Sequence, residues 1–246
     1  MWAGRTLSGR DRFGWWKVHS NDGWDDSPES KGESISIPNG DGEYDLPVYN
    51  DARMVTVSGR ILTSSHVQLH EAGMYLTGAM KGRFQVAGHG PTLWADAKRD
   101  GKIKFTPITD TLATWQVPMK MVDPVKYGDA KQFTVLSGSS YTTLYHRGNY
   151  MSLPVLTIKG DMPGGYEIRS SAGAIYRVTK PLLSGTPQVI DMRDGMLQNA
   201  GLYGGSGVTR ADIWRIPPGS TATTIRIMPI TTGTATMTVD VTDSYI

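Results

Sequence analysis

The chain has 246 residues, carries 25 Lys and Arg against 23 Asp and Glu, and contains no cysteine. The length fits one large β domain or two smaller ones. The near balance of charge leaves no electrostatic footprint for tight nucleic-acid binding. The absence of cysteine excludes disulfides, thiolate zinc sites and cysteine nucleophiles.

Glycine and proline are frequent, with 29 and 14 residues, and they predict many short elements joined by turns, as in an all-β chain. No apolar run approaches the ~20 residues that a membrane-spanning helix needs. Residues 1–14 lack the apolar block of a signal peptide. We therefore expect no export signal and no membrane partner.

The first half of the chain predicts strands around a single helix. Its apolar alternation indicates strands at residues 13–18, 53–62, 84–87, 93–99, 102–106 and 114–121. Residues 21–51 are rich in Gly, Asp, Pro and Ser, and they predict a long loop with at most a short strand at 34–37. A loop of this length in a compact domain is either functional or disordered.

The helix is expected to begin after Ser65 and to end near Gly82. Ser65 can act as the N-cap, and Gln68 three residues later completes a capping box. The helix is expected to bury one apolar face, made of Leu69, Met74, Leu76 and Met80.

Turn and breaker residues add three expectations. Asp100-Gly101 and Asp194-Gly195 each predict a tight hairpin. Pro118 interrupts the donors of the strand at 114–121, because proline has no backbone N–H. We therefore expect that strand at a sheet edge or at a bulge.

The second half predicts a β-sandwich. Residues 126–152 are interpreted as a linker with short strands at 132–136 and 141–145, between domains at 1–125 and 153–246. Further strands are expected at 155–159, 166–169, 174–179, 188–191, 213–216, 223–228 and 234–241. The predicted core of this domain includes Trp214, Ile216, Ile225 and Ile227.

The residues that could carry chemistry form no catalytic motif. His66 and His70 have a zinc-compatible spacing, but the Glu of the H-E-x-x-H metalloprotease motif is missing, so a solvated helix face is favoured. The acidic runs at 22–26 and 41–45 miss the EF-hand order, and turn formation explains them better than calcium. P-loop and serine-elbow motifs are also missing. We expect no enzyme activity, no metal and no cofactor.

Four stretches resemble the distal tail protein family of siphoviruses, the long-tailed bacteriophages, particularly forms from phages of actinobacteria. They are PNGDGEYD at 38–45 before VTVSGRI at 55–61, WQVP at 115–118 before VDP at 122–124 and Tyr127, Gly148-Asn149 before PVLTIKG at 154–160, and WRIPPGS at 214–220 with the ending at 243–246. Their order and spacing over most of the chain carry the resemblance. One departure is the short segment before Trp15.

The resemblance implies a mainly β fold with a tail-tube-like first domain, which contains the helix, and a galectin-like second sandwich. It implies a homo-oligomeric structural protein of the virion, a hexameric ring at the tail tip. The ring would join the tail tube above to the tail-associated hub and fibre proteins below, and DNA would pass through it without specific binding.

The long loop is expected to reach a neighbouring subunit, because its second half holds apolar anchors among polar residues. The candidate interface residues are Ile35, Ile37, Tyr44, Leu46, Tyr49 and Pro118. The alternative is a carbohydrate-binding module or host-surface adhesin that uses the second domain. An enzyme is the third possibility, which the missing motifs disfavour.

Overall fold

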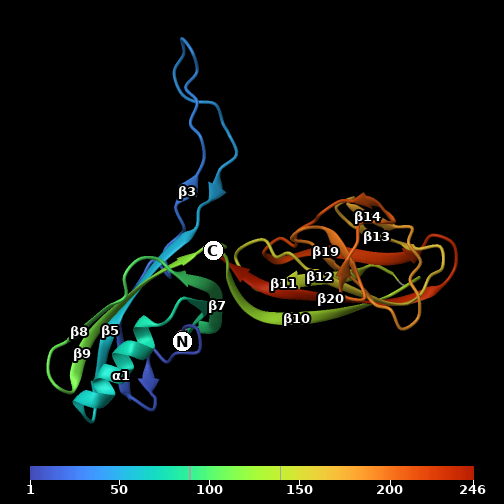
Figure 1. The fold of residues 1–246 in the computed structure, drawn as a ribbon. Coiled ribbons are helices and arrows are strands. Elements are labelled where there is room, and N and C mark those ends of the chain that lie inside the picture. Colours follow the sequence, from blue (N-terminus) through green and yellow to red (C-terminus); the bar gives the residue numbers. More distant parts are fainter. Residues whose placement is uncertain (89, 139) are drawn as a thin grey trace. The chain divides into compact units, whose positions relative to one another are not determined.

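The computed structural model describes residues 1–88, 90–138 and 140–246. The chain divides into two compact units, Met1–Lys126 (unit 1) and Tyr127–Tyr245 (unit 2). Both consist mainly of antiparallel strands, and α1 in unit 1 is the one helix of the described residues (Figure 1). The predicted mainly β fold class is confirmed.

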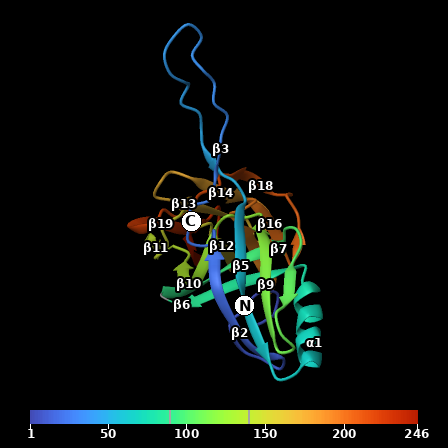
Figure 2. The same cartoon turned by 90° about the vertical axis from the view of Figure 1, so that its left-hand side faces the viewer.

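Unit 1 is built on a sheet in the order β1-β2-β5-β9-β7, with β6 paired to β7 and β8 paired to β9 (Figure 2). Its strands are β1 (Gly9–Arg10), β2 (Gly14–Asp22), β5 (Arg53–Thr63), β6 (Lys81–Gly88), β7 (Gly90–Arg99), β8 (Lys104–Pro107) and β9 (Leu112–Met121). Every second residue of β5 and of β9 is buried, as their alternating sequences predict. The inward side chains, among them Val57, Ile61, Trp115 and Val117, form the core of the unit.

Helix α1 (His66–Thr77) packs one face against this core. Ser65 is its N-cap, as predicted, and the Ser65 Oγ accepts a hydrogen bond from the Gln68 backbone N–H at 3.4 Å. The helix ends at Gly78, earlier than Gly82. Its buried residues are Leu69, Ala72, Gly73 and Leu76.

The predicted burial of Met74 and Met80 was wrong, because both side chains are exposed. The inward face is set by Gly73, where a Cβ would lie only 3.0 Å from the ring of Phe105. The absence of a side chain lets the helix approach β8 closely, and this turns the row from Leu69 to Leu76 inward.

Strand β9 is an interior strand, so of the two positions predicted for it, a sheet edge or a bulge, the edge was wrong. β5 runs along one side of β9, while β8 pairs with residues 113–116 and β7 with residues 119–120 on the other. Pro118 falls in the gap between these two partners, and its carbonyl accepts a hydrogen bond from the Asp100 N–H at 3.0 Å. No ladder bond is lost there, because neither β7 nor β8 pairs with residue 118.

The hairpin predicted at Asp100-Gly101 was also wrong. β7 and β8 are both antiparallel to β9, so they run in the same direction along it. Asp100-Gly101 therefore connects two strands that pair one after the other along the same side of β9. Gly101 takes the positive φ of 96° that this connection requires. By contrast, Asp194-Gly195 lies in a true hairpin between two antiparallel strands of unit 2.

Unit 2 is a sandwich of two sheets, in the orders β10-β20-β12-β15-β16-β17 and β11-β19-β13-β14-β18. The strands of the first are β10 (Lys126–Leu136), β12 (Val155–Asp161), β15 (Gln188–Asp191), β16 (Met196–Asn199), β17 (Leu202–Tyr203) and β20 (Thr234–Tyr245). Those of the second are β11 (Thr142–His146), β13 (Tyr166–Ser170), β14 (Ile175–Val178), β18 (Val208–Ala211) and β19 (Gly219–Pro229).

The core of unit 2 includes the four residues named from the sequence: Trp214, Ile216, Ile225 and Ile227 are all buried. The strand expected at 213–216 is reduced to one bridge between Ser152 and Ile216. Residues 126–152, interpreted as a linker, supply strands β10 and β11 and place Val135 and Leu144 in this core. The division between the units accordingly lies before this segment.

Candidate subunit interface

Residues 22–51, named here the arm, leave the sheet of unit 1 between β2 and β5 as a long hairpin (Figures 1 and 2). Near its root, β3 (Ser30–Lys31) pairs with β4 (Tyr49–Asn50). Farther out, the Tyr44 N–H donates to the Ile35 carbonyl at 2.9 Å, and the Ile37 N–H donates to the Gly42 carbonyl at 3.1 Å. The predicted loop is thus a hairpin of two extended segments. The strand expected at 34–37 is reduced to one bridge between Ser36 and Glu43.

The arm presents apolar side chains that its own unit does not bury. Ile35, Tyr44 and Tyr49 are exposed, and Ile37 and Leu46 are half-buried. No residue between 32 and 48 is fully buried. Exposed apolar side chains that gather on one segment often mark a site where a protein binds a partner.

The arm is also strongly acidic. Residues 22–51 contain nine Asp and Glu and a single Lys, so the segment carries a charge of −8. The whole chain carries +2, and the remainder of the chain therefore carries +10. The near-neutral net charge of the chain is thus the sum of an acidic arm and a basic remainder.

Two buried cations hold the base of the arm. Arg53, which is 1% exposed, donates from Nη1 to the carbonyl oxygens of Gly23 at 3.0 Å and Trp24 at 3.2 Å, and also to that of Asp26. The Lys126 Nζ donates to the same Trp24 carbonyl at 3.0 Å. These bonds fix the first turn of the arm to the start of β5, while the arm residues beyond this turn are not part of the core.

Burial is the main electrostatic influence on this pair. It lowers the pKa of Lys126, and the positive charge of Arg53 lowers the pKa further, while Asp25 and Asp26 oppose both effects. Burial likewise lowers the pKa of Arg53, and the same two carboxylates raise it in opposition. The acidic residues at the base thus compensate the two cations that anchor it.

The outer face of the unit 1 sheet, defined by Trp15, Lys17, Arg60, Leu62 and Lys104, has the complementary character. Trp15 lies opposite Leu62, and Lys17 lies opposite Arg60, on neighbouring strands. Trp15 is 65% exposed and Leu62 is 53% exposed. Lys104 lies opposite Gln116 on the same side of the sheet. This face therefore joins an apolar end to three cations.

Pro118 lies half-buried on this same outer face, opposite Thr56. Because β9 is interior, Pro118 has no open sheet edge to offer to a neighbouring subunit. Sequence reasoning missed the outer face itself. Alternation could assign Trp15 and Leu62 to one side of their strands, but only the register of β2 on β5 brings them together.

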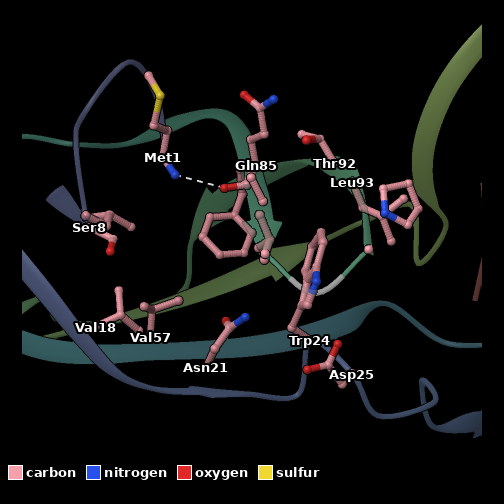
Figure 3. A pocket seen from close by; sticks show the side chains of 17 residues that line it. Met1, Ser8, Val18, Asn21, Trp24, Asp25, Val57, Gln85, Thr92 and Leu93 are labelled. Atoms are coloured by element: carbon pink, nitrogen blue, oxygen red, sulfur yellow. Dashed lines mark hydrogen bonds between the residues drawn. The ribbon is translucent and has the colours of Figure 1, made fainter.

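A groove of about 820 Å³ lies between β2 and the β6–β7 pair in unit 1 (Figure 3). Apolar side chains such as Val18, Trp24 and Leu93 line it, and Asp25 lies at the side where the arm begins. The Met1 ammonium donates to the Gln85 carbonyl at 2.8 Å across one end of the groove, and burial lowers its pKa. The groove is a second, mainly apolar surface of the unit.

The residues considered for metal binding do not converge in the described part of the chain. His66 and His70 are exposed on α1 and border a shallow groove with Asp110. Among the described residues, no three His, Asp or Glu side chains are placed to hold one ion. No described helix is long and apolar enough to cross a membrane.

No protein-family model matches the chain, and no curated relative matches it in sequence. Solved structures do share its fold. The Dit protein of phage SPP1, described as a paradigm of the hub adsorption apparatus in phages that infect Gram-positive bacteria, aligns with a TM-score of 0.73. The identity is 13%, over 94% of this chain and 93% of that chain.

A chain of the phage p2 baseplate, in its activated conformation with strontium, aligns with a TM-score of 0.52 at 7% identity, over 90% of this chain and 89% of that one. Both likenesses extend through unit 1 and unit 2. The resemblance to distal tail proteins inferred from the sequence is confirmed as a shared fold.

Proposed function

We propose that this chain is a structural protein of a phage tail tip, which forms a ring through unit 1 and joins the tail tube to the hub below it. One observation carries the proposal: the fold is shared with the SPP1 hub protein over more than nine-tenths of both chains. The ring is a hexamer in the virion, and its passage lets DNA through without binding a sequence.

The arm of one copy contacts the outer face of the next copy in this ring. The arm offers carboxylates beside Ile35, Tyr44 and Tyr49. The outer face offers lysine and arginine beside Trp15 and Leu62. The two surfaces are different patches of one chain, so the contact is head-to-tail, and such contacts close into a ring when the rotation allows.

Apolar burial and charge contribute differently to this contact. Covering a large apolar side chain such as Trp15 or Leu62 contributes roughly 1.5–3 kcal/mol each when burial is complete. The opposed charges add less to affinity, because exposed ion pairs are worth about 0–1 kcal/mol. Their main effects are to speed encounter and to select the orientation in which arm and face meet.

Native mass spectrometry and analytical ultracentrifugation of the full chain test the ring. We expect hexamers at micromolar concentration. The double variant Lys17→Glu/Arg60→Glu should dissociate them, because it places acidic residues against an acidic arm. Adding Glu43→Lys and Asp45→Lys to that variant should restore the ring.

A control with the same change of charge is Lys159→Glu/Arg193→Glu, because both side chains are exposed in unit 2. It should leave the ring intact. A chain that stays monomeric at all concentrations would reject the ring. A stable ring in the Lys17→Glu/Arg60→Glu variant would instead reject the outer face as the surface that receives the arm.

A further inference from the structure

The second sheet of unit 2 turns one face to the core and collects arginines on the other. Ile168, Tyr176 and Ile225 point inward and are buried. The opposite side, named here the arginine face, is defined by Arg169 on β13, Arg177 on β14, Arg210 on β18 and Arg226 on β19, together with Glu167 and Tyr141. These four strands are neighbours in the sheet, and the arginines lie across it as two pairs, offset by two residues along the strands.

The register places like charges directly opposite one another. Arg169 faces Arg226, and Arg177 faces Arg210. Such cross-strand pairs destabilise a sheet unless other groups compensate them. An arrangement that brings four guanidinium groups together on one face is therefore explained better by a ligand than by stability.

The compensation within the sheet is incomplete. Glu167, 4% exposed, binds both Arg169 and Arg177, with its Oε2 2.5 Å from the Arg177 Nη2. Burial raises the pKa of Glu167, but the hydrogen bonds from the two arginines outweigh it, and the pKa lies below its ordinary value. Asp212 pairs with Arg210 at 2.6 Å. Four arginines against two carboxylates leave the face with a charge of +2.

Arg226 is the uncompensated member. No carboxylate of the described residues pairs with it, and its Nε is buried without a hydrogen-bond partner. Its guanidinium lies 4.7 Å from the centre of the Tyr141 ring, which holds it in place by a cation–π contact. An incoming anion would supply the negative charge that no described carboxylate supplies to Arg226.

We propose that the arginine face binds an acidic polysaccharide, a sugar chain that carries carboxylate or sulfate groups. Guanidinium groups bind such oxyanions through paired hydrogen bonds of fixed geometry. Neighbouring strands are ~4.8 Å apart, so the two pairs offer donors at intervals to a bound chain. The Tyr141 ring adds an apolar surface beside these donors, suited to the C–H face of a sugar.

Nucleic acid fits this face less well. A duplex presents one negative charge per ~1.7 Å of its axis, and tight binding follows from neutralising many phosphates at once. The arginine face carries only +2 and holds Glu167 at its centre. The inference concerns unit 2 alone and is independent of the ring proposed for unit 1.

Isothermal titration of the full chain with polysaccharides tests this site. The probes are heparin (sulfated and carboxylated), polygalacturonate (carboxylated only) and neutral dextran, with a duplex DNA fragment as competitor. We expect binding to at least one acidic probe and none to dextran. Comparison of heparin with polygalacturonate shows whether sulfate is needed.

The variant Arg210→Gln/Arg226→Gln should weaken binding about ten-fold or more, because it removes two guanidinium groups that would donate charge-assisted hydrogen bonds to the anion. These two arginines leave the pairs of buried Glu167 intact, so the fold should be retained. Lys159→Gln/Arg193→Gln, a matched loss of two charges at exposed positions elsewhere in unit 2, should change binding less than two-fold. Tyr141→Ala, which frees the Arg226 side chain, should also weaken binding.

Several results would overturn the proposal. They are no binding to either acidic probe, an equal loss in Lys159→Gln/Arg193→Gln, or DNA bound as tightly as the better polysaccharide. A change in oligomeric state in Arg210→Gln/Arg226→Gln without any polysaccharide binding would also overturn it, because the face would then be a contact between copies of the chain.

Discussion

Trp214 fills the core of unit 2, where it is 5% exposed. Truncation to alanine should lower the free energy of unfolding by ~3–5 kcal/mol, since it removes a large buried side chain and leaves a cavity. Trp15→Ala is the control, because this ring is 65% exposed, and its effect should stay within ~0.5 kcal/mol. Urea denaturation followed by circular dichroism measures both. A Trp214→Ala protein as stable as the parent would place that ring at the surface.

Two buried tyrosines make unit 2 sensitive to alkali. Burial raises the pKa of Tyr166, and it raises the pKa of Tyr176 to about 12, from an ordinary value of 10.0. A raised folded pKa gives stability that is present below the unfolded pKa and is lost as pH rises through the folded one. Unfolding measured from pH 9 to 12 should therefore show stability falling above pH 10.0. Tyr176→Phe should make this fall shallower.

The hydroxyls of these tyrosines differ at neutral pH. The Tyr176 hydroxyl donates to the Gly195 carbonyl at 2.8 Å, so its removal should cost about 1 kcal/mol. The Tyr166 hydroxyl is buried without a partner, so Tyr166→Phe should be neutral or stabilising. Urea unfolding at pH 7 compares the two variants. A larger loss in Tyr166→Phe than in Tyr176→Phe would contradict this order.

Among the elements, the arm is separable from the body of unit 1. Replacing residues 32–48 with an Asn-Gly turn keeps the paired strands β3 and β4 and removes no buried residue. We expect the melting temperature of the dilute protein to be unchanged, while ultracentrifugation should show a weakened ring. A large drop in melting temperature would mean that the arm stabilises its own unit.

Local patterns predicted elements well where one face of a strand is buried and the other is not. The alternation in β5 fixed its extent to within one residue, as 53–62 against Arg53–Thr63. The same patterns failed where the partner strand decides the outcome. Pro118 is tolerated inside the sheet because its neighbour changes from β8 to β7 at that position. Asp100-Gly101 has hairpin chemistry, but β9 aligns the two flanking strands in one direction.

The candidate surfaces show the same division. The apolar anchors of the arm could be named from the sequence, since they lie close together along the chain. The outer face needs the register of β2 on β5, and the arginine face needs the register of four strands. No local signal marks residues that only long-range pairing brings together.

For the whole molecule, the separation of charge predicts a salt-sensitive assembly. Attraction between an arm of −8 and a body of +10 is screened as the Debye length falls from ~8 Å at 0.15 M salt to ~3 Å at 1 M. The dissociation constant of the ring should therefore rise with NaCl, as sedimentation at several concentrations would show. The shortened-arm variant should lose most of this dependence. A ring insensitive to salt would mean that apolar burial alone holds it.

The exposed tip of the arm is also a suitable position for a site-specific probe. The chain contains no cysteine, and Asp41 at the tip is exposed. An Asp41→Cys substitution would thus supply the only thiol in the molecule, at a place where a spin label or fluorophore disturbs no packed side chain. The mobility of such a probe distinguishes a mobile arm from one bound to a neighbouring surface. Crosslinking through the same thiol would identify the surface that the tip contacts during assembly.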